Sequence, residues 1–308
     1  MTMADLEKLI QRIEQIPTLP IVSQKILLLL SDENVSLPKV ASLIERDQAL
    51  AVKILKVANS AFYGTLSKVS TIDHALVILG IEEVRSILLA FSIHNFFSQH
   101  KDGHFDRTRF WKHSVVCSQI AKYLARYFNV VRDDTIFLAG LIHDMGKVVF
   151  DQYFHEDFLK IIDYISTNNE SFSRGEKQVL GITHYQVAAK LLQQWKFPEK
   201  VTMQVFYHHA PWHDKNYLTS SIIIYLANIF TKLAGYTCLE DEKIVTIDDL
   251  AQSKAMKFIV ESGFDLDAPT MEKLLQQIQE FLAEERDNML RFFDTETGQP
   301  SQNTQMAN

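Results

Sequence analysis

Glycine and proline are scarce in this chain of 308 residues, which has 10 glycines and 7 prolines, together roughly half the usual share. Because both residues interrupt helices, their scarcity favours long helices. The chain has only two cysteines, Cys117 and Cys238. Both lie within apolar helical patterns, where a thiol behaves as a small buried hydrophobe. Such sparse use of cysteine fits a reducing compartment.

An excess of positive charge is also missing, because the formal net charge is -7. Nucleic acid and anionic lipid are polyanions, so this balance argues against both as main partners. The most apolar stretches, residues 21–30 and 220–234, are interrupted or too short to cross a bilayer. Residues 1–15 lack the layout of a signal peptide, a basic segment followed by an apolar one. We therefore expect a cytoplasmic protein that does not enter a membrane.

Helical periodicity dominates what is present. Hydrophobic residues make up 47 % of the chain and charged residues 22 %, a composition that can form a sizeable core. No segment alternates with period two, so the predicted fold class is all-α, a multi-helix bundle. We expect a helix from Ile21, one between Ser36 and Asp47, and further helices over 48–59, 72–79, 81–97, 107–129, 133–150, 155–168, 183–195, 198–208, 217–234, 246–262 and 269–293.

Local signals mark some helix ends and domain boundaries. Thr71 is placed to cap the helix that Gly80 ends, and Asn59 is placed to satisfy backbone groups where a helix ends. The polar break at 99–104 suggests a boundary between two helical subdomains. We therefore predict four parts: an N-terminal helical subdomain (1–100), a second helical subdomain (105–235), a C-terminal helical extension (236–294) and a polar tail (295–308).

The pair His143-Asp144 follows an apolar helical run. A neutral imidazole next to a carboxylate suits a hard or borderline cation. For an isolated pair, the simpler interpretation is a helix end with a partly exposed histidine and an aspartate bonded to a backbone amide. The pair is not isolated, because His113, His184 and the pair His208-His209 lie on separate predicted helices.

Four helices that each offer an inward ligand are how helical bundles assemble polynuclear metal sites. The spacing alone does not show that these side chains converge. Taken singly, each histidine fits a hydrogen-bonded or exposed position better than a ligand position. The six remaining histidines keep that interpretation: His74, His94, His100, His104, His155 and His213.

The ordered set of these histidines and Asp144 resembles the metal-binding pattern of the HD phosphohydrolase superfamily. Residues 19–20, 47–50 and 54–63, followed by Ile72, Ala75 and Leu79-Gly80, resemble the bacterial HDOD domain. Residues 181–184, 191–192, 195, 197–198 and 208–209 resemble the second half of the same family. Together these signatures cover roughly residues 14–215. The resemblance implies an HD-domain-like helical core behind an N-terminal helical subdomain.

The resemblance also implies roles for individual residues. Asp144 is expected to bridge two ions of iron, manganese or zinc, with the remaining ligands supplied by His113, His143, His184, His208 and His209. Lys147 occupies the position of the superfamily's Gly-Lys. A lysine there can face a substrate phosphate, which makes Asp144 and Lys147 the candidate catalytic residues. The alternative for Lys147 is a solvated side chain near a helix end.

Two positions and one motif depart from the pattern of the metal-dependent relatives. Arg109 stands where the HD-GYP relatives have a glutamate, so a third metal is not expected. The Gly-Tyr-Pro motif is missing after His209, which disfavours cyclic di-guanylate as a substrate. Asn228 replaces the last aspartate ligand with a neutral amide, which weakens the activation of a bound water.

HDOD domains are regarded mainly as signalling and scaffolding modules. The favoured prediction is therefore a signal-transduction module that retains an HD-type metal site and binds a signalling protein in trans, with weak catalysis or none. The alternative is a metal-dependent phosphohydrolase acting on a nucleotide or phosphomonoester, which the five histidines favour and the two substitutions disfavour. A third hypothesis is a metal or redox sensor.

Overall fold

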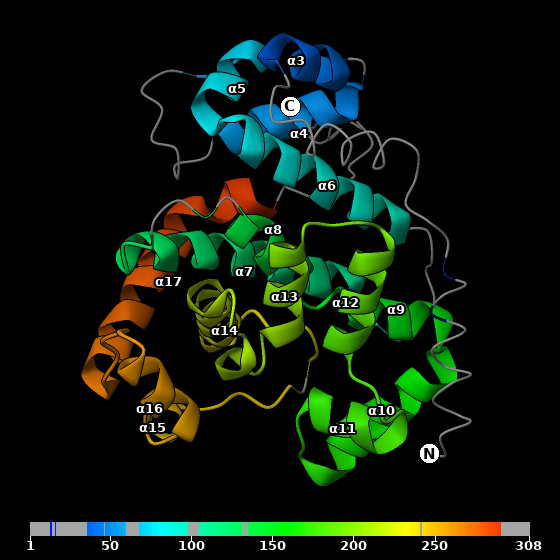
Figure 1. Ribbon diagram of the computed structural model, residues 1–308, viewed down its shortest axis with the longest axis vertical. Helices are drawn as coiled ribbons and strands as arrows, with labels where there is room; N and C mark the ends of the chain where they lie inside the picture. Colours follow the sequence, from blue (N-terminus) through cyan, green and yellow to red (C-terminus); the bar gives the residue numbers. More distant parts are fainter. Residues whose placement is uncertain are drawn as a thin grey trace, which may run out of the picture.

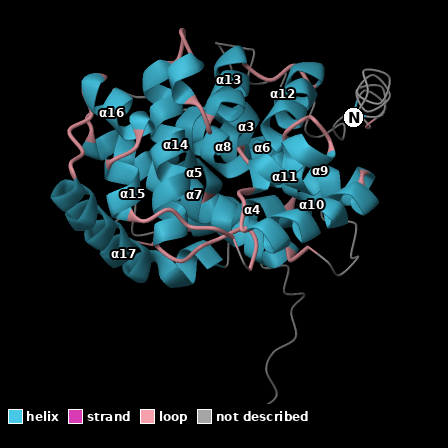
Figure 2. Cartoon of the chain, turned by 90° about the horizontal axis from the view of Figure 1, so that it is seen from below, coloured by secondary structure: helices cyan, strands magenta, loops and turns pink. Residues whose placement is uncertain are grey.

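The computed structural model describes residues 36–45, 47–59, 68–97, 105–130, 135–240 and 242–290, together with residues 13, 16 and 133. Every regular element in this part of the chain is a helix, which confirms the predicted all-α class (Figure 2). Four of the described helices come before residue 100: α3 (Leu37–Glu45), α4 (Gln48–Ala58), α5 (Ile72–Leu79) and α6 (Ile81–Phe97). Those that follow are α7 (Arg107–Tyr127), α8 (Thr135–Ile142), α9 (Met145–Tyr153), α10 (His155–Asn168), α11 (Phe172–Val179), α12 (His184–Gln194), α13 (Glu199–Tyr207), the 3₁₀ turn η2 (Pro211–His213), α14 (Leu218–Leu233), α15 (Ile247–Ala251), α16 (Lys254–Glu261) and α17 (Ala268–Leu290).

The helices α3 to α6 lie at one end of the molecule, and α6 connects them to the rest by packing on α8 (Figure 1). In the larger part, α7 packs against α8 and α14, while α12 packs against α9 and α13. The late helix α17 packs on α7 and α14. Its buried Leu274 and Ile278 therefore belong to the same hydrophobic core as Phe110 and Phe150. The predicted domain boundaries stay predictions.

The local signals for helix ends are confirmed. The Thr71 hydroxyl accepts a hydrogen bond from the His74 amide, and Gly80 ends α5 with a φ of 79°. Asn59 donates from its side-chain amide to the carbonyls of Leu55 and Val69. Its side-chain oxygen accepts from the Val69 amide at 2.8 Å, so one side chain joins the end of α4 to the segment that precedes α5.

Two predicted helices are interrupted in the structure. The helix expected over 133–150 breaks at His143-Asp144, which form a turn between α8 and α9. Successive side chains of a helix point about 100° apart, so an unbroken helix would turn these two side chains in different directions. The helix expected over 246–262 breaks before α16, because the Ser253 hydroxyl accepts from the Met256 amide and starts a new helix.

The helix α11 was not predicted, because it is mostly polar and has a short buried face. Three predictions lie outside the described residues: the helix from Ile21, the polar break at 99–104 and the tail over 295–308. Among the described helices, none is both long and apolar enough to cross a membrane.

Candidate metal centre

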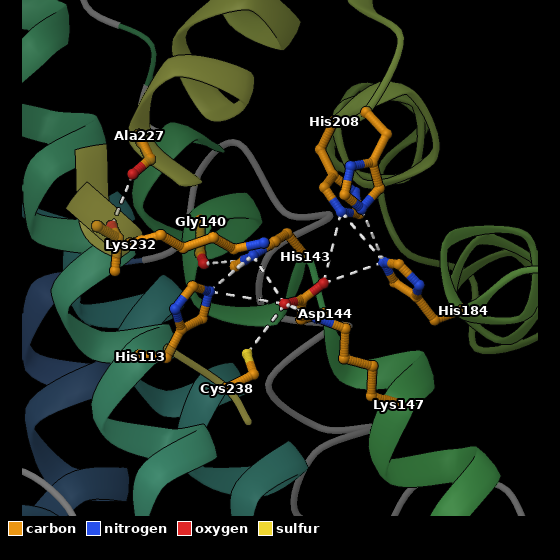
Figure 3. A network of polar contacts seen from close by, with 12 residues as sticks. His113, Gly140, His143, Asp144, Lys147, His184, His208, Ala227, Lys232 and Cys238 are labelled. Atoms are coloured by element: carbon orange, nitrogen blue, oxygen red, sulfur yellow. Dashed lines mark hydrogen bonds and ion pairs between the residues drawn. The ribbon is translucent and has the colours of Figure 1, made fainter. Parts of the chain in front are cut away.

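The six predicted metal ligands converge in the core (Figure 3). They come from elements that are distant in the sequence: α7, the turn between α8 and α9, the first residue of α12, and the two residues that follow α13. Five of the six residues have no exposed surface, and the sixth, His209, is half-buried. The interpretation of His143-Asp144 as a partly exposed helix end is therefore wrong. The Asp144 side chain also makes no capping hydrogen bond.

The two carboxylate oxygens of Asp144 face different histidines. Its Oδ1 lies 3.0 Å from His184 Nε2 and 3.5 Å from His208 Nε2. Its Oδ2 lies 3.3 Å from His143 Nε2 and 3.6 Å from His113 Nε2. Asp144 is thus shared by two groups whose potential ligand atoms lie within 4.8 Å of one another: Asp144 with His184, His208 and His209, and Asp144 with His113 and His143.

Backbone carbonyls hold three of the imidazoles. The Nδ1 atom of His113 lies 2.8 Å from the Tyr236 carbonyl, and that of His143 lies 2.7 Å from the Gly140 carbonyl. The Nδ1 atom of His208 lies 2.6 Å from the carbonyl of Val205. A carbonyl only accepts hydrogen bonds, so Nδ1 is the protonated nitrogen in each ring. In a neutral imidazole the lone pair is then on Nε2, the atom that faces the centre.

The fourth imidazole is held by a carboxylate that the sequence analysis missed. His184 Nδ1 lies 2.8 Å from Glu176 Oε2, and the His184 amide donates to Oε1 at 2.9 Å. Burial raises the pKa of Glu176, and His184 opposes that shift. A carboxylate behind a histidine ligand fixes the orientation of the ring and raises its basicity. Nothing in the sequence distinguishes Glu176 from a solvated glutamate.

The Nε2 atoms of these histidines lie close to one another. The Nε2 atom of His113 lies 3.3 Å from that of His143, and His184 Nε2 lies 3.3 Å from His208 Nε2. The Nε2 atom of His209 lies 3.1 Å from His184 Nε2. In addition, the buried Oδ1 of Asp144 lies 3.0 Å from His184 Nε2 and 3.5 Å from His208 Nε2. Imidazole nitrogens that converge on a buried carboxylate are an arrangement that a cation stabilises, so the donor set fits a metal ion.

The charge of Asp144 is balanced by a proton on His143 and by the ammonium of Lys147. Burial and the neighbouring His143 lower the pKa of His113 to about 3. Burial also lowers the pKa of His208 to about 3. At His143, burial is outweighed by Asp144 and Cys117, which raise its pKa to about 10. His143 therefore carries a proton beside Asp144 that a metal ion would displace.

Lys147 does not occupy the solvated position that was one of its two predicted alternatives. Its side chain is 1 % exposed, and its ammonium lies 2.6 Å from Asp144 Oδ2. Burial lowers the pKa of Lys147, but Asp144 more than compensates and keeps it raised. Its charge is neutralised within the core.

Cys238 also reaches the centre, although the sequence indicated a helical and purely apolar position for it. The residue lies in the irregular segment after α14, and its thiol donates to Asp144 Oδ2 at 3.1 Å. Burial raises the pKa of this thiol well above its usual value. The error arose because the apolar pattern of α14 continues into this segment, where the chain turns back toward the core.

The two positions that depart from the family pattern have distinct surroundings. Arg109 donates to the Thr237 hydroxyl at 3.4 Å and lines a cavity of about 210 Å³ together with Lys112 and Tyr236. Asn228 is 3 % exposed on α14, and its side-chain oxygen has no hydrogen-bond partner. Neither residue supplies the anionic ligand that the resemblance associates with its position.

Comparison with known proteins identifies the family. The model of the HDOD domain matches residues 16–211, which is well over half of the chain. The chain therefore belongs to the HDOD domain family, as the sequence motifs predicted. Two uncharacterised proteins are each 25 % identical to it, one from Treponema pallidum over 201 residues and YuxH from Bacillus subtilis over 141 residues. The matches cover 64 % and 46 % of this chain, but only 38 % and 32 % of those proteins.

Solved structures share the fold over nearly the whole chain. An HDOD domain protein of unknown function from Geobacter sulfurreducens is 22 % identical with a TM-score of 0.76, covering 94 % of this chain and 97 % of that one. A putative signal transduction protein from Marinobacter aquaeolei is 23 % identical with a TM-score of 0.69, and the match covers 94 % of this chain and 65 % of that one. A putative metal-dependent phosphohydrolase from Shewanella amazonensis is 19 % identical with a TM-score of 0.65, and the match covers 94 % of this chain and 100 % of that one.

Proposed function

We propose that this HDOD protein is a signalling module whose histidine and aspartate cluster binds one or two divalent cations of iron, manganese or zinc. In this proposal the ion stabilises the arrangement of α7, α9, α12 and α13, and a signalling protein in trans binds the surface of that arrangement. The name of the Marinobacter structure supports the signalling part of the proposal. The mixed imidazole and carboxylate donors support the choice of metals.

The burial of the centre is the observation that carries this proposal. His113, His143, Asp144, His184 and His208 have no exposed surface. The ammonium of Lys147 is already paired with Asp144, so it is not free to bind a substrate phosphate. A hydrolase must bring its substrate into contact with the metal and the attacking water. In this conformation the centre is placed to stabilise the helices and is poorly placed to meet a substrate.

A second function is favoured by the way Asp144 is shared. Its two oxygens face separate groups of histidines, which is the arrangement of a carboxylate bridging two ions. Bound ions would polarise a phosphoryl group and lower the pKa of a bound water. The name of the Shewanella structure points the same way. The alternative is therefore a metal-dependent phosphohydrolase acting on a nucleotide or phosphomonoester.

The deciding experiment compares wild type with Asp144→Asn, both without a histidine tag and both loaded in turn with Fe²⁺, Mn²⁺ and Zn²⁺. Thermal unfolding and hydrogen exchange in α7 and α12 report structural stabilisation. Hydrolysis of p-nitrophenyl phosphate and of a panel of nucleotides reports catalysis. We expect the metal to raise the unfolding temperature of wild type only, with no turnover above that of Asp144→Asn.

The possible results distinguish the functions. Turnover in wild type that Asp144→Asn abolishes would establish the phosphohydrolase instead. If neither protein retains metal after loading, both metal-based functions fail, and a scaffold that binds partners without metal is left.

A further inference from the structure

The only two cysteines of the chain both lie at the pair His143-Asp144. The Cys238 thiol donates to Asp144 Oδ2 at 3.1 Å, and the Cys117 thiol interacts with His143. Both cysteines are buried and free of disulfides. Cys117 comes from the middle of α7 and Cys238, shown in Figure 3, from the segment after α14, so the two thiols belong to separate elements.

The segment that carries Cys238 is anchored on both sides of the thiol. On one side, the Tyr236 carbonyl lies 2.8 Å from Nδ1 of His113. On the other, the Cys238 amide donates to Glu242 Oε2 at 3.0 Å, and Glu242 Oε1 lies 2.6 Å from the ammonium of Lys232. The same segment therefore orients the His113 imidazole and holds the thiol against Asp144. Supports of this kind are what keep metal ligands in place.

The group formed by His113, His143 and Asp144 contains a single anionic donor. Asp144 is the only carboxylate in the group with His113 and His143, and it is shared with the second group. Oδ2, the Asp144 oxygen that faces these two histidines, is also paired with the Lys147 ammonium at 2.6 Å. Elsewhere in the core, on α14, Asn228 offers a neutral amide where the family pattern has an aspartate, and its buried side-chain oxygen has no hydrogen-bond partner. Two imidazoles and half of one carboxylate leave most of the charge of a divalent cation uncompensated.

We propose that Cys238 is a thiolate ligand of the ion held by His113, His143 and Asp144, an inference that rests on the metal centre proposed above. When the ion binds, the thiol proton leaves to solvent and a bond from sulfur to the metal replaces the hydrogen bond to Asp144. No electron is transferred in this step. The thiol lies outside the group whose donor atoms are within 4.8 Å of one another, so ligation draws it from Asp144 toward the imidazoles. A soft sulfur ligand favours zinc or iron over manganese.

X-ray absorption of the zinc-loaded protein tests this assignment. Sulfur ligands lie about 2.3 Å from zinc, while nitrogen and oxygen ligands lie at about 2.0–2.2 Å. We expect one sulfur scatterer in wild type and in Cys117→Ser, and its loss in Cys238→Ser. Cobalt loading gives a second measurement, because a thiolate bound to Co²⁺ adds a charge-transfer absorption that nitrogen and oxygen ligands do not produce.

The outcomes separate the two proposals. If wild type binds zinc with nitrogen and oxygen ligands only, the Cys238 assignment is overturned and the metal centre stands. If wild type binds neither zinc nor cobalt, the centre and the assignment are overturned together. Should Cys238→Ser fail to fold, wild type and Cys117→Ser still decide the matter, because Cys238 is the only cysteine left in Cys117→Ser.

Discussion

Gly146 packs directly against the backbone of His184. A Cβ atom built on Gly146 would lie 2.0 Å from the His184 carbonyl oxygen and 2.8 Å from its Cα. This contact joins the first turn of α9 to the first residue of α12, so it sets the distance between Asp144 and His184. The glycine is needed for space, because it lies within a helix and not at a residue of positive φ.

Gly146→Ala is expected to push α12 away from α9, destabilise the protein by about 1–3 kcal/mol or more, and lower its zinc content. Urea unfolding and elemental analysis measure the two effects. Gly263→Ala is the control, because nothing lies within 4 Å of a Cβ atom added at Gly263, although its φ of 97° makes alanine strained there. Equal effects of the two substitutions would contradict the special role of Gly146.

Asp144→Asn is expected to remove metal from both ligand groups, whereas His209→Ala should empty only one. The reason is that Asp144 belongs to both groups and His209 to one. Elemental mass spectrometry of untagged protein measures the stoichiometry, and circular dichroism confirms that each variant is folded. An Asp144→Asn protein with the metal content of wild type would show that the ion binds elsewhere.

Glu176→Gln is expected to weaken metal binding by about 10–100-fold, the usual effect of losing an outer partner of a histidine ligand. A neutral amide keeps the shape of Glu176 but orients the His184 ring less strongly and lowers its basicity. Competition titration with a chromophoric chelator measures the affinity. The exposed Glu156→Gln serves as the control, and the prediction fails if the two variants bind metal equally well.

Acid is expected to lower the free energy of unfolding by protonating Glu242. Burial alone would raise the pKa of this residue, but Lys232 and Lys147 outweigh it and lower the pKa from 4.5 to about 2. The depressed value means that the ionised side chain stabilises the folded state above pH 4.5, by about 3 kcal/mol. That contribution is lost progressively as the pH falls from about 4.5 toward 2.

The Glu242→Gln variant isolates this contribution from those of other carboxylates. Urea unfolding of wild type and variant at pH 7, 4 and 3 gives the difference in the free energy of unfolding. We expect the difference to be largest at pH 7 and to shrink as the pH falls. A difference in the free energy of unfolding that stays constant across this range would mean that the pKa of Glu242 is the same in the folded and unfolded states.

Much of the helical architecture follows from local pattern. The apolar periodicity predicted most of the helices, and the roles of Thr71, Gly80 and Asn59 depend on neighbours within ten residues. The errors have physical causes as well. The break at His143-Asp144 is hidden because both flanking segments are apolar, and α11 has too little buried surface to produce a clear pattern.

The sequence predicted which residues come together at the site but not their surroundings, and their role as metal ligands stays a prediction. All six predicted metal ligands meet in the structure, because the order of their motifs carries the family pattern. Glu176, Cys238 and Glu242 were missed, since nothing near them in the sequence marks them as functional. Cys238, for example, contacts a carboxylate 94 residues earlier in the chain.

The sequence by itself determined the all-helical class and the family, and it predicted the inward donors, because helical periodicity and the motifs and their order are visible along the chain without knowledge of how the helices pack. Only the tertiary structure decided that Asp144 divides its oxygens between two histidine groups, that Lys147 is paired within the core, and that a thiol approaches the same carboxylate. The physical reason is that the rise and turn of a helix fix distances within it, whereas distances between helices depend on packing along the whole chain.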